Sequence, residues 1–147
     1  MDKAYLVALI DSLNNKIDVL NKINEKNVEQ YKLIKAEPFS VEVFDKNSNE
    51  KGVLIYQLNQ LDDGFKLIYD KIGDELSKNK AEYASEIRKM QEQISTITDL
   101  STKIQADEAR NKAALEAYFA RERGQIKGSR SRANAAKSYA KAMQNRT

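Results

Sequence analysis

The chain has 147 residues, enough for one domain with a modest core, and its 25 basic and 22 acidic residues give a net charge of +3. It contains no cysteine and no histidine, which excludes disulfides, thiolate metal sites and histidine-based catalysis. Charged, amide and aliphatic residues dominate the composition, and there are only five glycines and one proline. Such a composition favours helices over sheets.

The first predicted helix covers about residues 2–35. Two asparagines, Asn24 and Asn27, interrupt an otherwise apolar heptad seam. Its other members are Leu6, Ile10, Leu13, Ile17, Leu20, Tyr31 and Ile34. A seam asparagine costs stability unless it finds a hydrogen-bond partner, and it can then fix the register of the helices. We interpret these asparagines as register or helix-end devices rather than as a binding site.

Residues 36–52 interrupt the helical pattern. Pro38 disfavours helical geometry at Glu37, and apolar residues alternate with polar ones only over the five residues from Phe39 to Val43. We therefore predict a short extended segment packed against the bundle. An exposed loop follows it as far as Gly52, either mobile or with a turn of helix from Asn47 onward.

The second predicted helix, residues 53–77, carries the most regular apolar stripe: Leu54, Leu58, Leu61, Phe65, Ile68, Ile72 and Leu76. Gly64 and Gly73 each weaken a helix by up to about 1 kcal/mol relative to alanine, and either one can allow close approach of a neighbour. Tyr56 and Tyr69 flank the stripe, and we interpret both as packing at its edge.

Residues 77–80 form a short connection, which predicts that the second and third helices are antiparallel neighbours. Ser77 or Asn79 is expected to cap the third helix.

The third predicted helix covers residues 81–123, and its first 42 residues lack both proline and glycine. Its apolar stripe becomes polar midway, at Ser101, Glu108 and Asn111, among several alanines. Two explanations remain open at this point. The small residues allow neighbouring helices to approach closely, or this end projects past the bundle and leaves an apolar patch, formed by Leu115, Tyr118 and Phe119, that is exposed or covered by a partner.

Residues 124–147 form a predicted basic amphipathic tail, separate from a helical bundle of residues 1–123. Gly124 and Gly128 break the pattern, and Ser129 or Ser131 can cap a short last helix with a small apolar face of Ala136, Tyr139, Ala140 and Met143. From Arg121 onward the sequence has eight basic residues and one acid. Such a helix is marginal alone, so we expect a partner to order it.

The overall prediction is an all-α protein. It consists of a long antiparallel helical hairpin or three-helix coiled-coil-like bundle, with a short C-terminal amphipathic helix.

No pattern in the sequence indicates catalysis. Adjacent carboxylates such as Asp62 with Asp63, or Asp74 with Glu75, point in different directions on a helix and are poor acid–base pairs. The sequence shows no phosphate-binding glycine loop, calcium loop or nucleotide fingerprint. We therefore expect no enzyme activity, no cofactor and no small-molecule ligand.

Hydropathy and charge also bear on whether the protein binds membranes or nucleic acids. The sequence shows neither a signal-peptide pattern nor an apolar run of eighteen residues, so we expect a cytoplasmic protein without membrane insertion. The basic tail permits nonspecific electrostatic binding to nucleic acid, although the acidic body would repel phosphate. A merely solvated tail remains an alternative.

Two stretches resemble the flagellar export chaperones of the FlgN/FliT type. The run from Glu108 to Phe119, Glu-Ala-Arg-Asn-Lys-Ala-Ala-Leu-Glu-Ala-Tyr-Phe, is similar to the family's asparagine–leucine run near a helix end, and Ala136–Lys141 resembles its tail. The insert at residues 38–52 departs from the family.

The resemblance implies a non-catalytic role. The chain would hold the terminal helices of hook-associated or filament-cap proteins and deliver them to the type III export gate. The implied apolar contacts are Leu115, Tyr118, Phe119, Ala136, Tyr139 and Met143, with Arg130, Arg132 and Lys137 steering an acidic client. Self-association as a structural coiled coil, including a homodimer, is the alternative, and a basic-tail nucleic-acid binder ranks behind it.

Overall fold

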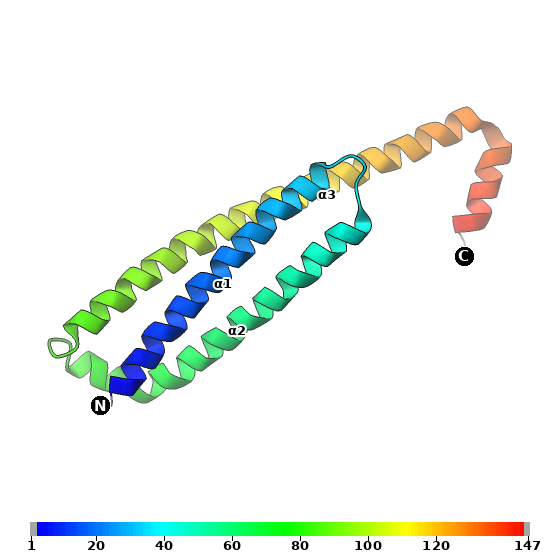
Figure 1. The fold of residues 1–147 in the computed structure, drawn as a ribbon. Coiled ribbons are helices and arrows are strands. Elements are labelled where there is room, and N and C mark those ends of the chain that lie inside the picture. The colour runs from blue at the N-terminus through cyan, green and yellow to red at the C-terminus, as the bar shows by residue number, and fades with distance from the viewer. Residues whose placement is uncertain (1–2, 146–147) are drawn as a thin grey trace. The chain divides into compact units, whose positions relative to one another are not determined.

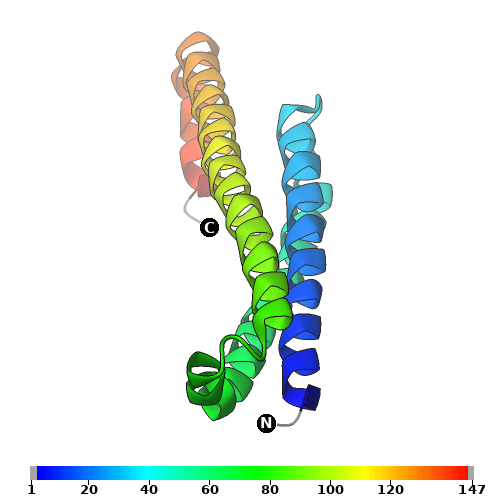
Figure 2. The ribbon, with the colours of Figure 1, turned by 90° about the vertical axis from the view of Figure 1, so that its left-hand side faces the viewer.

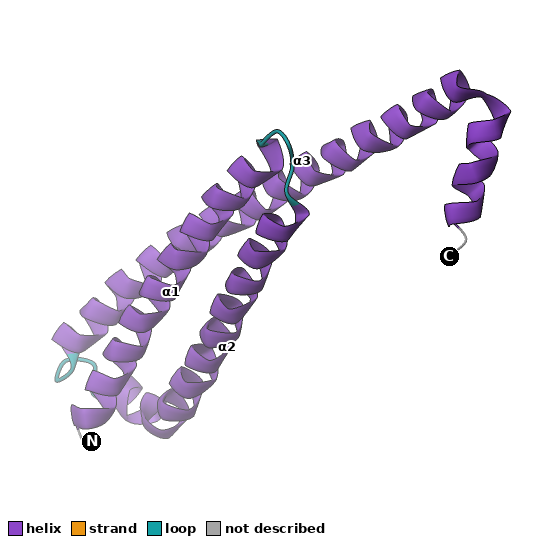
Figure 3. Ribbon diagram, turned by 45° about the vertical axis from the view of Figure 1, so that its right-hand side comes forward, coloured by secondary structure: helices purple, strands orange, loops and turns teal. Residues whose placement is uncertain are grey.

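The computed structural model describes residues 3–145, with side chains described as far as Gln125. Three helices follow one another, α1 (Lys3–Lys35), α2 (Val41–Lys78) and α3 (Ala84–Asn145). No strand occurs among the described residues, and short connections join the helices (Figure 3). The predicted all-α fold class is therefore confirmed. The chain divides into two compact units, unit 1 at Met1–Asn111 and unit 2 at Lys112–Thr147.

Unit 1 is a bundle of α1, α2 and the first part of α3. α2 runs antiparallel to α1, and the turn between α2 and α3 lies at the same end of the bundle as the start of α1 (Figures 1 and 2). This part of α3 therefore runs parallel to α1. The predicted antiparallel arrangement of the second and third helices follows from the same turn.

Most of the core of unit 1 comes from the apolar stripes that the heptad pattern predicts, and Leu9, outside the predicted seam of α1, joins it. Leu6 and Leu9 are almost completely buried. Burial of one such side chain contributes about 1.5–3 kcal/mol, which is what holds helices of this polar composition together. The buried cluster contains residues of all three helices and of the turn before α3: Leu6, Leu9, Leu13, Leu20, Ile72, Leu76, Tyr83, Met90 and Ile97.

The prediction of an extended segment and loop at residues 36–52 is wrong, because α2 already begins at Val41. Ser40 is its N-cap, and the side-chain oxygen accepts a hydrogen bond of 3.2 Å from the backbone amide of Val43. Phe39 and Phe44, on either side of this cap, pack with their ring centroids 5.7 Å apart, the arrangement of a hydrophobic staple. The cap and staple start the helix at Val41, three residues after Pro38.

The residue at the end of α2 also differs from its predicted role. Asn79 is the C-cap of α2 rather than the N-cap of the third helix. Its side-chain amide and its backbone amide both donate to the carbonyl of Glu75, at 2.9 and 3.0 Å. This pair of hydrogen bonds to one carbonyl ends α2, and the chain turns toward α3 over the five residues 79–83.

The predicted separate C-terminal helix is not found, since α3 continues without a break from Ala84 to Asn145. Gly124 and Gly128 therefore lie inside a helix. A glycine in a helix interior costs only about 1 kcal/mol relative to alanine, and two of them do not outweigh the neighbouring good helix formers.

Candidate functional site

The sequence-predicted contact residues with described side chains lie in the first turns of unit 2. Leu115 and Tyr118 are half-buried, and Phe119 is 44% exposed. The rings of Tyr118 and Phe119 meet edge to face, with centroids 5.5 Å apart. The structure thus brings these two aromatic residues together as one apolar patch, here called the aromatic patch.

The other predicted contacts lie within α3 but beyond the residues whose side chains are described. They are Arg130, Arg132, Ala136, Lys137, Tyr139 and Met143.

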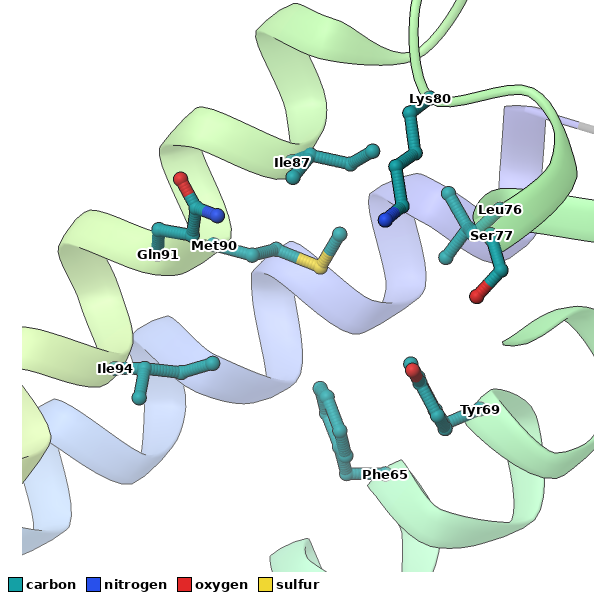
Figure 4. Close-up of a pocket in the computed structure, with 9 residues that line it drawn as sticks. All are labelled: Phe65, Tyr69, Leu76, Ser77, Lys80, Ile87, Met90, Gln91 and Ile94. Carbon is teal, nitrogen blue, oxygen red and sulfur yellow. The ribbon is translucent and has the colours of Figure 1, made fainter. Parts of the chain in front are cut away.

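A second apolar surface, which the sequence did not indicate, lies in unit 1 between α2 and the start of α3. It is a groove with a volume of about 200 Å³. Figure 4 shows side chains from both helices and from the turn converging on it. We call it the α2–α3 groove, and it is lined by Phe65, Tyr69, Leu76, Ser77, Lys80, Ile87, Met90, Gln91 and Ile94.

The rim of the α2–α3 groove is open to solvent on both walls. Tyr69 on α2 is 46% exposed and Ile94 on α3 is 49% exposed. Met90 forms a buried floor between them. The hydrophobic stripes of the two helices therefore continue outward past the closed core, so that part of their apolar surface remains uncovered.

Polar side chains of all three helices of unit 1 meet in a separate cluster, here called the polar layer: Asn27 and Gln30 on α1, Asn47 and Lys51 on α2, and Glu108 and Asn111 on α3. Asn27, Gln30, Asn47, Lys51 and Asn111 are buried. The ammonium group of Lys51 donates to the side-chain oxygens of Asn27 at 3.1 Å, Gln30 at 3.3 Å and Glu108 at 2.8 Å. One cation therefore has partners on both neighbouring helices.

Asn111 completes the polar layer from α3. Its side-chain amide donates to the backbone carbonyl of Asn27 at 2.9 Å and to the side-chain oxygen of Gln30 at 3.1 Å. Arg110 lies over the ring of Tyr31, 4.2 Å from its centroid. The side-chain oxygen of the seam asparagine Asn27 thus has a partner on α2, Lys51, whereas Asn111 on α3 bonds to its main-chain carbonyl.

The polar layer is not fully satisfied. Oδ1 of Asn24, close to the layer on α1, Nδ2 of Asn27 and Oδ1 of Asn47 are buried and have no hydrogen-bond partner among the described residues. Each such atom offsets part of the energy that the paired atoms contribute. The net stabilisation from the layer is therefore smaller than its number of hydrogen bonds suggests.

Two kinds of site are absent from the described part of the chain. No group of three or more Asp or Glu side chains there is arranged to hold a metal ion. Within residues 3–145, none of the three helices carries the sustained apolar run that a membrane-spanning helix needs.

The α2–α3 groove left two weak signals in the sequence. Tyr69 lies beside the apolar stripe of α2, and Gly73 lies four residues after Tyr69. The sequence alone does not indicate which residues the Tyr69 ring packs against. In the structure, a Cβ built at Gly73 would lie 3.0 Å from Cε1 of Tyr69. The glycine therefore provides the space in which the tyrosine ring rests on its own helix.

Comparison with known proteins adds no further constraint. No family model, curated protein or solved structure matches this chain.

Proposed function

We propose that this protein is a non-catalytic export chaperone. In this proposal it binds the helical termini of flagellar hook-associated or filament-cap proteins and delivers them to the type III export gate. The aromatic patch in unit 2 would contact the client, together with the basic tail, and the protein would act in the cytoplasm.

The observation that carries the proposal is the exposure of Phe119 beside Tyr118. Phe119 leaves 44% of its surface uncovered on a helix whose neighbouring positions, such as Arg121 and Arg123, are charged and exposed. An aromatic pair rimmed by charge is typical of a surface that receives an amphipathic helix. The family resemblance of residues 108–119 falls on the same stretch.

Binding of purified client segments tests the proposal. The full-length chain is titrated with the C-terminal helical segments of hook-associated and filament-cap proteins in a calorimeter. The double variant Tyr118→Asp with Phe119→Asp should weaken binding at least tenfold, and so should Tyr139→Asp with Met143→Asp. Helical circular dichroism should stay unchanged in both.

Tyr5→Asp is the matched control, because Tyr5 is an aromatic residue of α1 with a similar exposure of 40%. It should bind clients as the parent chain does. Undiminished binding by both double variants, or the absence of binding to every client segment, would contradict the proposal.

Self-association is the second candidate, and a specific feature of α2 favours it. Val53, Tyr56 and Leu67 are 58%, 63% and 67% exposed and lie on one side of the helix. Sedimentation at two concentrations distinguishes the candidates. A dimer that Leu67→Asp dissociates would support self-association through this face, whereas a monomer at both concentrations would exclude it as the main role.

A further inference from the structure

The walls of the α2–α3 groove are formed before any ligand arrives. The rings of Phe65 and Tyr69 stack at 6.0 Å with an interplanar angle of 10°. Gly73 leaves room for the Tyr69 ring, because any larger side chain there would press on it. A binding surface that needs no rearrangement loses less free energy on association, and Met90 on the floor can adapt to different shapes.

The size of the groove defines what enters it. Its volume of about 200 Å³ compares with the roughly 150 Å³ apolar cavity that holds one benzene ring. It is smaller than typical sites for drug-sized ligands, which start at about 300 Å³. The groove therefore suits one large side chain, such as leucine, methionine or phenylalanine, presented by a larger molecule.

Lys80 gives the groove its polarity. Among the nine lining residues it is the charged one, and its ammonium group extends from the turn toward Met90 (Figure 4). No ion pair or hydrogen bond of Lys80 occurs among the described residues. A cation beside an apolar groove favours an occupant with a carboxylate close to its apolar anchor.

The same charge argues against this chain's own C-terminal segment as the occupant. Residues 124–147 contain six basic residues and no acidic one, so the tail of a second copy would place like charges near Lys80. An acidic helix of a different protein satisfies both features of the groove.

We propose that the α2–α3 groove binds one turn of an amphipathic helix from another protein. One large apolar side chain inserts between Tyr69 and Ile94, and an Asp or Glu one turn away pairs with Lys80. This site belongs to unit 1, whereas the aromatic patch on which the export proposal rests belongs to unit 2. The α2–α3 groove would bind a second partner protein, or a second segment of the client that the aromatic patch binds.

Synthetic peptides test the site directly. A panel of fluorescein-labelled helical peptides carries one Leu, Met or Phe anchor and a Glu three or four residues before or after it. Matched peptides replace the Glu by Lys or the anchor by Ala. Fluorescence anisotropy with the full-length chain should give at least tenfold tighter binding for the best anchor–Glu peptide than for either matched peptide.

Charge reversal and wall variants then locate the binding. Lys80→Glu should reverse the preference, so that the Lys peptide binds more tightly than the Glu peptide. Ile94→Asp should weaken binding at least tenfold. Lys89→Glu is the matched control, since Lys89 is exposed on α3 and does not line the groove. Circular dichroism and urea unfolding confirm that each variant is folded.

Three outcomes would overturn the inference. The first is that no peptide of the panel binds at millimolar concentration. The second is that binding survives Ile94→Asp but is lost in Tyr118→Asp with Phe119→Asp, which assigns it to the aromatic patch. The third is a dimer that Ile94→Asp dissociates, which assigns the groove to a second copy. Loss of client binding by the aromatic-patch variant alone bears on the export proposal and leaves this one intact.

Discussion

Lys51 on α2 places its ammonium group 2.8 Å from the carboxylate of Glu108 on α3. The same group donates to Asn27 on α1, so a single buried cation connects three helices. A lysine in this position must keep every partner, because an ammonium group removed from water without compensation is strongly unfavourable.

Lys51→Met should lower the free energy of unfolding by about 1–3 kcal/mol. The methionine keeps most of the volume but leaves the oxygens of Asn27 and Gln30 without this donor. The loss is smaller than for a fully buried pair, because the side chain of Glu108 is 44% exposed and can recover hydration. Urea unfolding followed by circular dichroism measures the change.

Lys66→Met is the control for that measurement. Lys66 also pairs with a carboxylate, that of Asp70 at 2.8 Å, but its side chain is 75% exposed. Its replacement should change the free energy of unfolding by less than about 0.5 kcal/mol. Equal losses in the two variants would show that the polar layer contributes no more than a surface ion pair.

Ser40→Ala should destabilise the protein by about 1 kcal/mol, because it removes the side-chain acceptor of the Val43 amide at the start of α2. Hydrogen exchange should accelerate at Val43 and Phe44, while the core amides near Leu9 keep their relative protection. Ser95→Ala, at an exposed position inside α3, should be neutral or slightly stabilising. A loss confined to Ser95→Ala would contradict the capping role.

Two of the three glycines of α2, Gly64 and Gly73, should respond differently to alanine. A Cβ at Gly64 meets nothing within 4 Å, so Gly64→Ala should stabilise the protein by about 0.5–1 kcal/mol through helix propensity. A Cβ at Gly73 would lie 3.0 Å from the Tyr69 ring, so Gly73→Ala should gain less or lose stability. The urea midpoints of the two variants give the comparison, and equal gains would contradict the contact.

Ionisation of the Tyr83 hydroxyl should lower the stability of the protein at alkaline pH. Burial, reinforced by nearby Glu82 and Glu75, raises the pKa of this hydroxyl above its ordinary value of 10.0. The folded state therefore holds the proton more tightly than the unfolded state. Stability from this group is complete below about pH 10 and falls as the pH rises toward the folded pKa.

Tyr83→Phe should remove the loss of stability at alkaline pH that comes from ionisation of the Tyr83 hydroxyl. Its free energy of unfolding should fall less steeply than that of the parent chain as the pH rises above about 10, the pKa of an unperturbed tyrosine. Tyr56→Phe, which changes a tyrosine that is 63% exposed, should follow the parent curve. Parallel curves for all three proteins would exclude a contribution from Tyr83.

The sequence was sufficient for the all-α class and for most of the core, because leucine and isoleucine at helical spacing form one apolar face per helix that must be buried. It was insufficient at residues 36–52, where Asn47 and Lys51 resemble loop residues until their partners on α1 and α3 are known. The pairing of Asn27 with Asn111 depends on the alignment of two helices, and the stripe pattern leaves that alignment free by whole turns.

Of the two candidate sites, one could be predicted from the sequence and the other could not. Tyr118 and Phe119 are neighbours in sequence, so their patch could be predicted locally. The α2–α3 groove could not, because it combines Tyr69 with Ile94 across a turn whose geometry follows from the two hydrogen bonds of Asn79 to Glu75.

The bond between Asn111 and the main chain of Asn27 joins positions 84 residues apart. Because synthesis proceeds from the N-terminus, α1 and α2 are made before residues 108–111. A newly made hairpin thus keeps Lys51 and Gln30 hydrated until the last helix arrives, and assembly of unit 1 ends with the expulsion of that water.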